Sequence, residues 1–107
     1  MRIIARRTLK AFVESRRDHK DHRALQAAID AWFWEASKAR WQNMAEVKSL
    51  YASASIVSSE RIVFNIKGND YRLVTAADFE KGILWIKWIG THRDYDRIDV
   101  TEVKYHE

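Results

Sequence analysis

The stretch that decides the fold is RIVFNIKGNDYRLVTAADFEKGILWIKWIGT, residues 61–91. Apolar and polar residues alternate along much of it with a period of two, which is typical of strands with one buried face. Two turn signals interrupt it, Gly68-Asn69 and Glu80-Lys81-Gly82. We therefore expect three antiparallel strands, at about 61–67, 70–78 and 83–90.

The chain before this stretch favours helices. Residues 24–38 are rich in Ala and carry an apolar stripe at helical spacing, and Asn43 with Glu46 resembles a capping box that begins a short helix. Thr8 stands where the N-cap of an earlier helix is expected, after a short strand at 2–6. Residues 53–59 contain four serines and are expected to form a loop. The pattern predicts one α+β domain over residues 1–107, with the helices first and an antiparallel meander after them.

The pairing of the strands assigns side chains to faces. If Gly68-Asn69 is a two-residue hairpin loop, Asn65 lies opposite Arg72, and opposite residues share a face. One face is then a core face, with Ile62, Phe64, Ile66, Tyr71, Leu73, Thr75, Leu84, Ile86 and Trp88. The other, which we call the mixed face, carries Arg61, Val63, Asn65, Lys67, Asp70, Arg72, Val74, Ala76, Trp85, Lys87, Ile89 and Thr91.

The mixed face gathers several groups that can bind an anion. Parity brings together Asn65, Lys67, Arg72 and Lys87, with Trp85 beside them. His92 and Tyr95 follow directly after the last strand, within reach of that surface. Such a surface suits an anionic nucleic-acid backbone and offers an aromatic ring for base stacking. The alternative is an ordinary solvated strand face, which antiparallel sheets commonly have.

Composition excludes several classes of site. The 107 residues contain no cysteine, which rules out disulfides, zinc–thiolate sites and thiol nucleophiles. The net charge is +4 and the pI about 9.5, and the first 23 residues hold eight Lys or Arg against three acids. This bias favours a polyanionic partner, or else marks a solvated helix face. Neither a signal peptide nor a membrane span is recognisable, so we expect a cytoplasmic protein without a membrane partner.

The polar stretch GTHRDYDRID, residues 90–99, admits three uses: metal binding, acid–base chemistry or a turn. His19 and His22 are three residues apart but have no third ligand nearby, and His106 lies near the chain end, so we expect no metal. Thr91 and Asp94 form a helix-start pattern. Asp96 either orients His92 or Arg93 or caps that short helix, and the structural role is preferred.

The helical region offers four aromatic candidates for an RNA-stacking or partner-binding surface: Trp32, Phe33, Trp34 and Trp41. Trp32 fits the apolar stripe and is expected in the core. Trp34 lies on a different side of the helix, so it or Trp41 is a candidate for a partner interface, with partial burial as the alternative.

Residues 61–100 resemble the HigB family of bacterial toxins, within the RelE-like group of ribosome-dependent mRNA interferases. The most specific pieces are FNIKGNDYRLV at 64–74 and IGTHRDYD at 89–96. The resemblance implies a compact RelE-like fold, with the N-terminal strand and the helices packed on one face of an antiparallel sheet and the second face open to RNA. It implies cleavage of mRNA in the ribosomal decoding site and neutralisation by a cognate HigA-like helix-turn-helix antitoxin, through which DNA is contacted only indirectly.

The resemblance also implies a reaction without a cofactor or metal, in which the ribose 2′-hydroxyl attacks the adjacent phosphorus. Such a step needs proton-transfer groups and cations that stabilise the phosphorane. His92 is the leading general acid or base, and Tyr95 either shares proton transfer or stacks a base. The charge-stabilising candidates are Arg72, Lys87 and Lys67. The RNA-binding candidates are Arg61, Asn65, Asn69, Trp85 and Arg93. A non-catalytic RNA- or ribosome-binding module using the same face is the alternative function.

Overall fold

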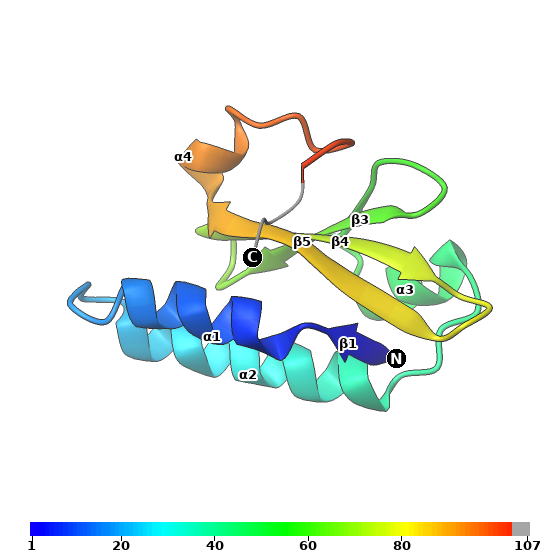
Figure 1. The fold of residues 1–107 in the computed structure, drawn as a ribbon, viewed down its shortest axis with the longest axis horizontal. Coiled ribbons are helices and arrows are strands. Elements are labelled where there is room, and N and C mark those ends of the chain that lie inside the picture. The colour runs from blue at the N-terminus through cyan, green and yellow to red at the C-terminus, as the bar shows by residue number, and fades with distance from the viewer. Residues whose placement is uncertain (104–107) are drawn as a thin grey trace.

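The structure is a computed structural model, and it describes residues 1–103. Figure 1 shows α1 and α2 on one side of the sheet and α4 with residues 96–103 on the other side. The elements in chain order are β1 (Arg2–Ile4), α1 (Arg6–Ser15), α2 (His22–Lys38), α3 (Met44–Leu50), β2 (Ser55–Ile56), β3 (Arg61–Ile66), β4 (Tyr71–Asp78), β5 (Ile83–Thr91) and α4 (His92–Tyr95). Within residues 1–103, no helix combines the length and the apolar character needed to cross a bilayer.

The five strands found within residues 1–103 belong to one sheet, in the order β1-β5-β4-β3-β2. β2 to β5 are antiparallel neighbours, while β1 pairs with β5 in parallel. The predicted α+β class is confirmed, and α1 and α2 pack on one face of the sheet (Figure 1). However, α4 lies on the other side, and β1 is itself a strand of the sheet, which is mixed rather than wholly antiparallel. The parallel pair joins a three-residue strand to one near the other end of the chain, which a local sequence pattern does not encode.

The helix predicted at 24–38 is confirmed as α2, and the buried stripe on it is Leu25, Ile29, Trp32 and Ala36. The predicted cap of α3 is also confirmed, since the side-chain oxygen of Asn43 accepts a hydrogen bond from the Glu46 amide at 3.0 Å. That bond satisfies one of the amides that the first turn leaves without a helical partner.

Two local predictions are wrong. Thr8 is not an N-cap, because α1 begins at Arg6 with Ala5 as its cap. Ala5 alone separates β1 from this helix, and it makes no side-chain capping bond. The segment 53–59 is not wholly a loop, because Ser55 and Ile56 pair with Val63 and Ile62 as a two-residue edge strand.

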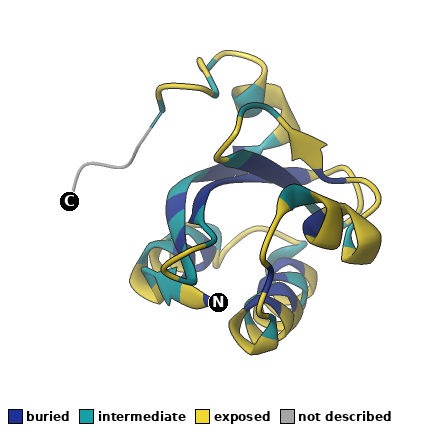
Figure 2. Ribbon diagram, turned by 90° about the vertical axis from the view of Figure 1, so that its right-hand side faces the viewer, coloured by how far each residue is buried: buried dark blue, intermediate teal, exposed yellow. Residues whose placement is uncertain are grey.

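The main core lies between the sheet and helices α1 and α2. Phe64 of β3 is 1% exposed and contacts the rings of Trp32, Trp41 and Tyr51, with centroid distances of 5.3, 6.2 and 5.1 Å. Figure 2 shows the central strands as a nearly continuous buried layer. Trp32 is therefore a core residue as predicted, and Trp41 is buried as well. Trp34 is 64% exposed on α2.

The register of the β3–β4 hairpin is as predicted: Asn65 lies opposite Arg72 and Ile66 opposite Tyr71. The turn is held by a hydrogen bond from the Asp70 amide to the Lys67 carbonyl, at 3.2 Å. Positive φ angles occur at Lys67 (54°) and Gly68 (65°). The strand pairing therefore stops at Ile66 and Tyr71, one pair short of the predicted Lys67 and Asp70.

A β-bulge between β4 and β5 changes the predicted faces. Thr75 pairs with Ile86, but the preceding Val74 pairs with Trp88, so β5 contributes one extra residue at Lys87. Beyond the bulge the parity is reversed: Trp88 lies on the mixed face, and Ile89 is 2% exposed in the core. The assignment of Trp88 to the core face and of Ile89 and Thr91 to the mixed face was wrong for this reason.

Part of the mixed face is covered by the chain that follows α4. The Arg61 guanidinium donates from Nη1 to the carbonyl oxygens of Val103 and Val100, at 2.7 and 3.4 Å. Val63 and Val74 on this face are only 1% and 0% exposed, although α1 and α2 lie on the other side of the sheet. The accessible part of the mixed face is therefore displaced toward β4, β5 and α4.

Candidate active site where the sheet meets α4

Helix α4 starts immediately after β5, and two contacts fix its first turn. The Thr91 hydroxyl accepts a hydrogen bond from the Asp94 amide at 3.1 Å, which confirms the predicted helix start. The amide of His92 donates to the carbonyl of Asp70 at 3.0 Å. This bond ties α4 to the β3–β4 hairpin and brings His92 beside Arg72, the second residue of β4.

His92 and Arg72 interact directly. The distance from Arg72 Nη2 to His92 Nδ1 is 3.3 Å. A guanidinium only donates hydrogen bonds, so this contact requires the neutral His92 tautomer that accepts at Nδ1 and carries its proton on Nε2. On that side, Asp96 Oδ1 is 3.7 Å from Nε2. Asp96 is also the C-cap of α4, so it occupies the predicted structural position and still faces His92.

The Arg72 side chain is held by backbone as well as by His92. Its Nη1 donates to the carbonyl of Asn69 at 3.1 Å and to that of Tyr71 at 3.4 Å. The guanidinium carbon lies 5.9 Å from the centre of the Tyr95 ring, within cation–π range. His92, Arg72 and Tyr95 thus form one cluster, in which a permanent cation touches both candidate proton-transfer groups.

Lys87 and Trp85 form a second pair nearer the start of β5, away from the end that joins α4. The Lys87 ammonium lies 6.0 Å from the centre of the Trp85 ring, so both are on the same face. Trp85 is opposite Ala76, a mixed-face residue, as predicted. Lys87 stands at the bulge and contacts Trp85, whereas the cluster around His92 lies at the end of the strand.

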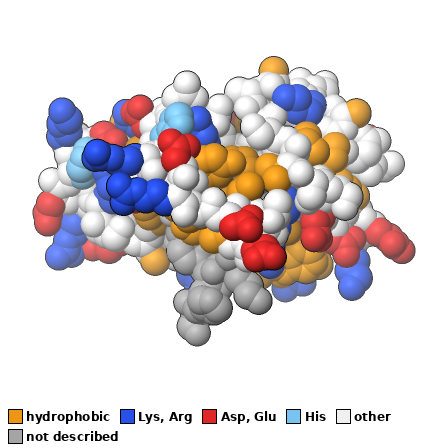
Figure 3. Space-filling model, turned by 90° about the horizontal axis from the view of Figure 1, so that it is seen from above, with side chains coloured by type: hydrophobic (Ala, Val, Ile, Leu, Met, Phe, Trp, Pro, Cys, Tyr) orange, Lys and Arg blue, Asp and Glu red, His pale blue; other side chains and the backbone are white. Residues whose placement is uncertain are grey.

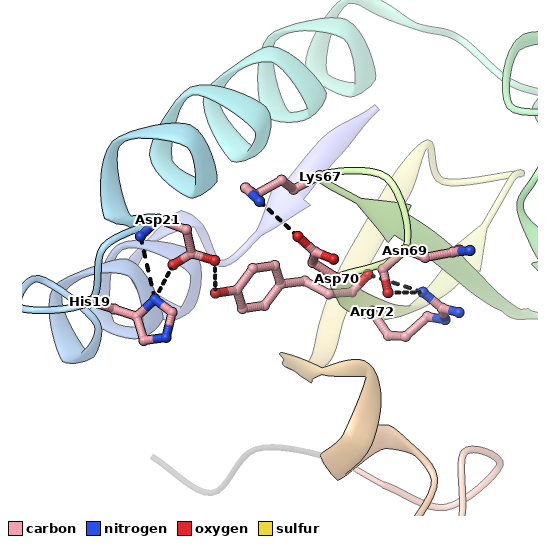
Figure 4. A network of polar contacts seen from close by, with 7 residues as sticks. His19, Asp21, Lys67, Asn69, Asp70 and Arg72 are labelled. Carbon is pink, nitrogen blue, oxygen red and sulfur yellow. Dashed lines mark hydrogen bonds and ion pairs between the residues drawn. The ribbon is translucent and has the colours of Figure 1, made fainter.

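Lys67 is directed away from this cluster. Its ammonium makes an ion pair with Asp70 Oδ2 at 2.7 Å, and this hydrogen bond raises the pKa of Lys67. Figure 4 shows the Lys67 and Arg72 side chains extending in different directions from the hairpin. The positive φ of Lys67 turns its side chain out of the predicted strand alternation.

The other RNA-binding candidates are dispersed. Arg61 binds the backbone of the C-terminal segment, and the Asn65 amide donates to the Ser53 carbonyl at 3.4 Å. Asn69 supplies its carbonyl to Arg72, and Arg93 is exposed on α4. Figure 3 shows that this side of the molecule has hydrophobic side chains at its centre, with cations and a histidine near them.

A buried tyrosine links the site to the turn between α1 and α2, a contact that the sequence pattern does not predict. The Tyr71 hydroxyl donates to Asp21 Oδ2 at 2.6 Å, and Asp21 Oδ1 lies 2.6 Å from His19 Nδ1 (Figure 4). Burial and the Asp21 carboxylate raise the pKa of Tyr71 to about 12. Burial works against ionisation of Asp21, but hydrogen bonds from Tyr71 and His19 bring its pKa below the usual range.

Among residues 1–103, no group of three or more His, Asp or Glu side chains is placed to hold a metal ion. His19 instead contacts Asp21, as described above. His106 lies outside the described residues.

Residues 25–98 match a family model described as HigB_toxin, RelE-like toxic component of a toxin-antitoxin system. The match covers more than half of the chain and includes Arg72, His92 and Tyr95. None of the curated proteins searched is similar to the chain at a significant level.

Proposed function

Since the chain belongs to the HigB family, the RelE-like toxic components of toxin–antitoxin systems, we propose that it is an endoribonuclease that cleaves mRNA on the ribosome. Family membership makes it the toxin of such a system and implies an antitoxin partner. The observation that best supports the enzymatic proposal is the contact between His92 and Arg72, 3.3 Å apart, with the Tyr95 ring beside Arg72.

The proposed reaction is attack of a ribose 2′-hydroxyl on the adjacent phosphorus, which leaves a cyclic phosphate and a free 5′-hydroxyl. One group must accept the proton of the 2′-hydroxyl, and another must protonate the leaving oxygen. His92 performs one of these transfers. The tautomer that Arg72 selects has a donor at Nε2, next to Asp96, and an acceptor at Nδ1.

Arg72 stabilises the negative charge that develops on the phosphorane. Its guanidinium is permanently charged and presents several donors in one plane, which suits two phosphate oxygens at once. When Arg72 turns toward a phosphate, it releases Nδ1 of His92 at the same place, so substrate binding and activation of the imidazole are coupled. Tyr95, under the guanidinium, shares proton transfer or stacks a base.

The remaining candidates take supporting roles in this proposal. Lys87 and Trp85 extend the binding surface along β5, and Asn69 and Arg93 flank it. Lys67 and Asn65 contribute at its edge. Arg61 serves mainly to hold the segment after α4 across the sheet, since its guanidinium binds two carbonyl groups there. Within residues 1–103, one hydrophobic core joins the helices to the sheet, which supports treating the chain as one RelE-like domain.

The partners that we propose are mRNA in the ribosomal decoding site and a HigA-like helix-turn-helix antitoxin, with DNA contacted only through that antitoxin. Expression of the chain alone is expected to arrest growth, and co-expression of the antitoxin to restore it. Mapping transcript 5′ ends after induction tests the activity itself, because cleavage within coding sequences creates ends that are absent before induction.

The competing function is a non-catalytic module that binds RNA or the ribosome through the same basic surface. It also predicts arrest, and its binding weakens as salt is raised, but it leaves the 5′ ends unchanged. Arrest without new 5′ ends would therefore contradict the endoribonuclease proposal and favour the module.

A further inference from the structure

Trp88 is the aromatic residue that the β-bulge moves to the mixed face. Its partner across the sheet is Val74, and the next residue on that face of β5 is Gly90, opposite Arg72. Trp88 and Arg72 therefore lie on the same side of two neighbouring strands. Trp88 is partly exposed, whereas the core tryptophans Trp32 and Trp41 are only 3% and 5% exposed.

The indole ring of Trp88 packs against the backbone of Gly90. A Cβ atom placed on Gly90 would lie 2.4 Å from Cη2 and 2.5 Å from Cζ2 of Trp88, far closer than van der Waals contact. The ring thus extends over the backbone of Gly90 toward the end of β5. It can occupy this position only because residue 90 has no side chain.

The indole ring of Trp88 lies next to the proposed catalytic cluster of His92, Arg72 and Tyr95. Its ring centre is 6.3 Å from that of Tyr95, with the ring planes tilted by 51°. Tyr95 in turn lies under the Arg72 guanidinium, which contacts His92. The contacts thus form a continuous series. The aromatic ring of Trp88 contacts that of Tyr95, Tyr95 contacts the Arg72 cation, and Arg72 contacts the proton-transfer group His92.

We propose that Trp88 is the stacking surface for a nucleobase adjacent to the phosphate that Arg72 binds. Its packing against Gly90 and next to Tyr95 holds the ring in place. The inference rests on the proposed function, since it assigns a further RNA-positioning residue to that site. A base has a flat π-face that matches the indole, and the neighbouring cation holds the phosphate of the same nucleotide or the next. A base fixed on Trp88 would align the scissile phosphate with His92.

The test is a binding measurement that does not depend on cleavage. The probe is a fluorescein-labelled, single-stranded 2′-O-methyl RNA, which lacks the attacking hydroxyl, and the readout is fluorescence anisotropy. Trp88→Ala is expected to weaken binding about 5- to 150-fold, the range that loss of one stacked base gives. Trp88→Phe should retain most of the affinity. Gly90→Ala should weaken binding because it displaces the ring, and Trp34→Ala on α2 is the matched control that should not.

A thermodynamic cycle makes the assignment specific. Abasic nucleotides are placed at each position of the probe in turn. For the wild-type protein, removal of the base at one position is expected to lower the affinity. For Trp88→Ala, removal of the same base should not lower the affinity further, because the base and the indole act as a pair. Thermal unfolding of each variant shows that affinity is compared between folded proteins.

Equal affinity of folded Trp88→Ala and wild type, or absence of RNA binding by the wild type, would overturn the inference. Weaker antitoxin binding by Trp88→Ala with unchanged RNA affinity would overturn it too, and would place Trp88 in a protein interface. If the RNA affinity depends on Trp88 as expected but no new 5′ ends form in cells, the stacking surface would be upheld and the endoribonuclease function refuted.

Discussion

Replacing Tyr71 by Phe tests whether the turn between α1 and α2 supports the site. The substitution removes only the hydroxyl that donates to Asp21 at 2.6 Å. The ring contacts remain, including the edge of Phe12 at 5.8 Å and the Arg16 guanidinium at 5.1 Å. Any change in stability therefore reports this hydrogen bond and the loss of one of the two side-chain partners of the Asp21 carboxylate, since His19 still contacts Oδ1.

A hydrogen bond to a charged group contributes about 1.5–3 kcal/mol, and this one is partly buried, so a loss of about 1.5–2 kcal/mol is expected. In a domain of this size, that lowers the melting temperature by roughly 5–10 °C. The pKa of Asp21 is below its ordinary value of 3.8, so the contribution is complete above that pH and is lost as the pH falls through the lowered pKa. The pKa of Tyr71 is raised from 10 to about 12, so the contribution is complete below pH 10 and is lost as the pH rises to about 12.

The assay is urea unfolding of wild type and Tyr71→Phe at several pH values. Tyr51→Phe is the matched control, because it removes a similar 2.6 Å bond to Glu35, away from His92. Only Tyr71→Phe should also slow cleavage, since Tyr71 adjoins Arg72 and lies opposite Thr91, the residue before His92. Equal stability of Tyr71→Phe and wild type at pH 7, or the same loss at pH 2.5 as at pH 7, would refute this reasoning.

Three further changes test the fold. Phe64→Ala should cost about 3–5 kcal/mol in urea unfolding, because the ring is buried among three aromatic rings; a loss below 1 kcal/mol would contradict that packing. Gly82→Ala should cost about 1 kcal/mol through its φ of 69° alone, since a Cβ there would meet no atom within 4 Å, and an unchanged midpoint would argue against this turn. Arg61→Gln should speed hydrogen exchange at the amides of residues 99–103 by releasing the carbonyl groups that Arg61 binds, and unchanged protection there would show that the contacts do not hold the segment.

The hairpin could be predicted from sequence because a short turn fixes the register of its strands. Gly68 and the alternation on both sides leave one pairing that keeps Arg72 out of the core, and that pairing places Asn65 opposite it. His92 could be placed near Arg72 because it follows the adjacent strand directly. Both parts of the site depend on short connections.

The face of Trp88 could not be predicted, because a single extra residue at the bulge reverses the alternation without a sequence signal. Lys87 suits either an ordinary strand position or a bulge, since its long stem can bring the ammonium to the surface. The bond between Tyr71 and Asp21 joins positions 50 residues apart, and only the packing of α1 and α2 under the sheet brings them together. Long-range contacts of this kind are what the local pattern omits.

The most direct test of the proposed function is single-turnover cleavage of mRNA bound to purified ribosomes. Wild-type protein is expected to cut the mRNA in the decoding site, and His92→Ala to cut it about 10²- to 10⁴-fold more slowly, the usual contribution of a general acid or base. Arg93→Ala, a neighbouring exposed cation on α4, is the control for altered charge and should lose far less. Cleavage by folded His92→Ala at the wild-type rate would contradict the account.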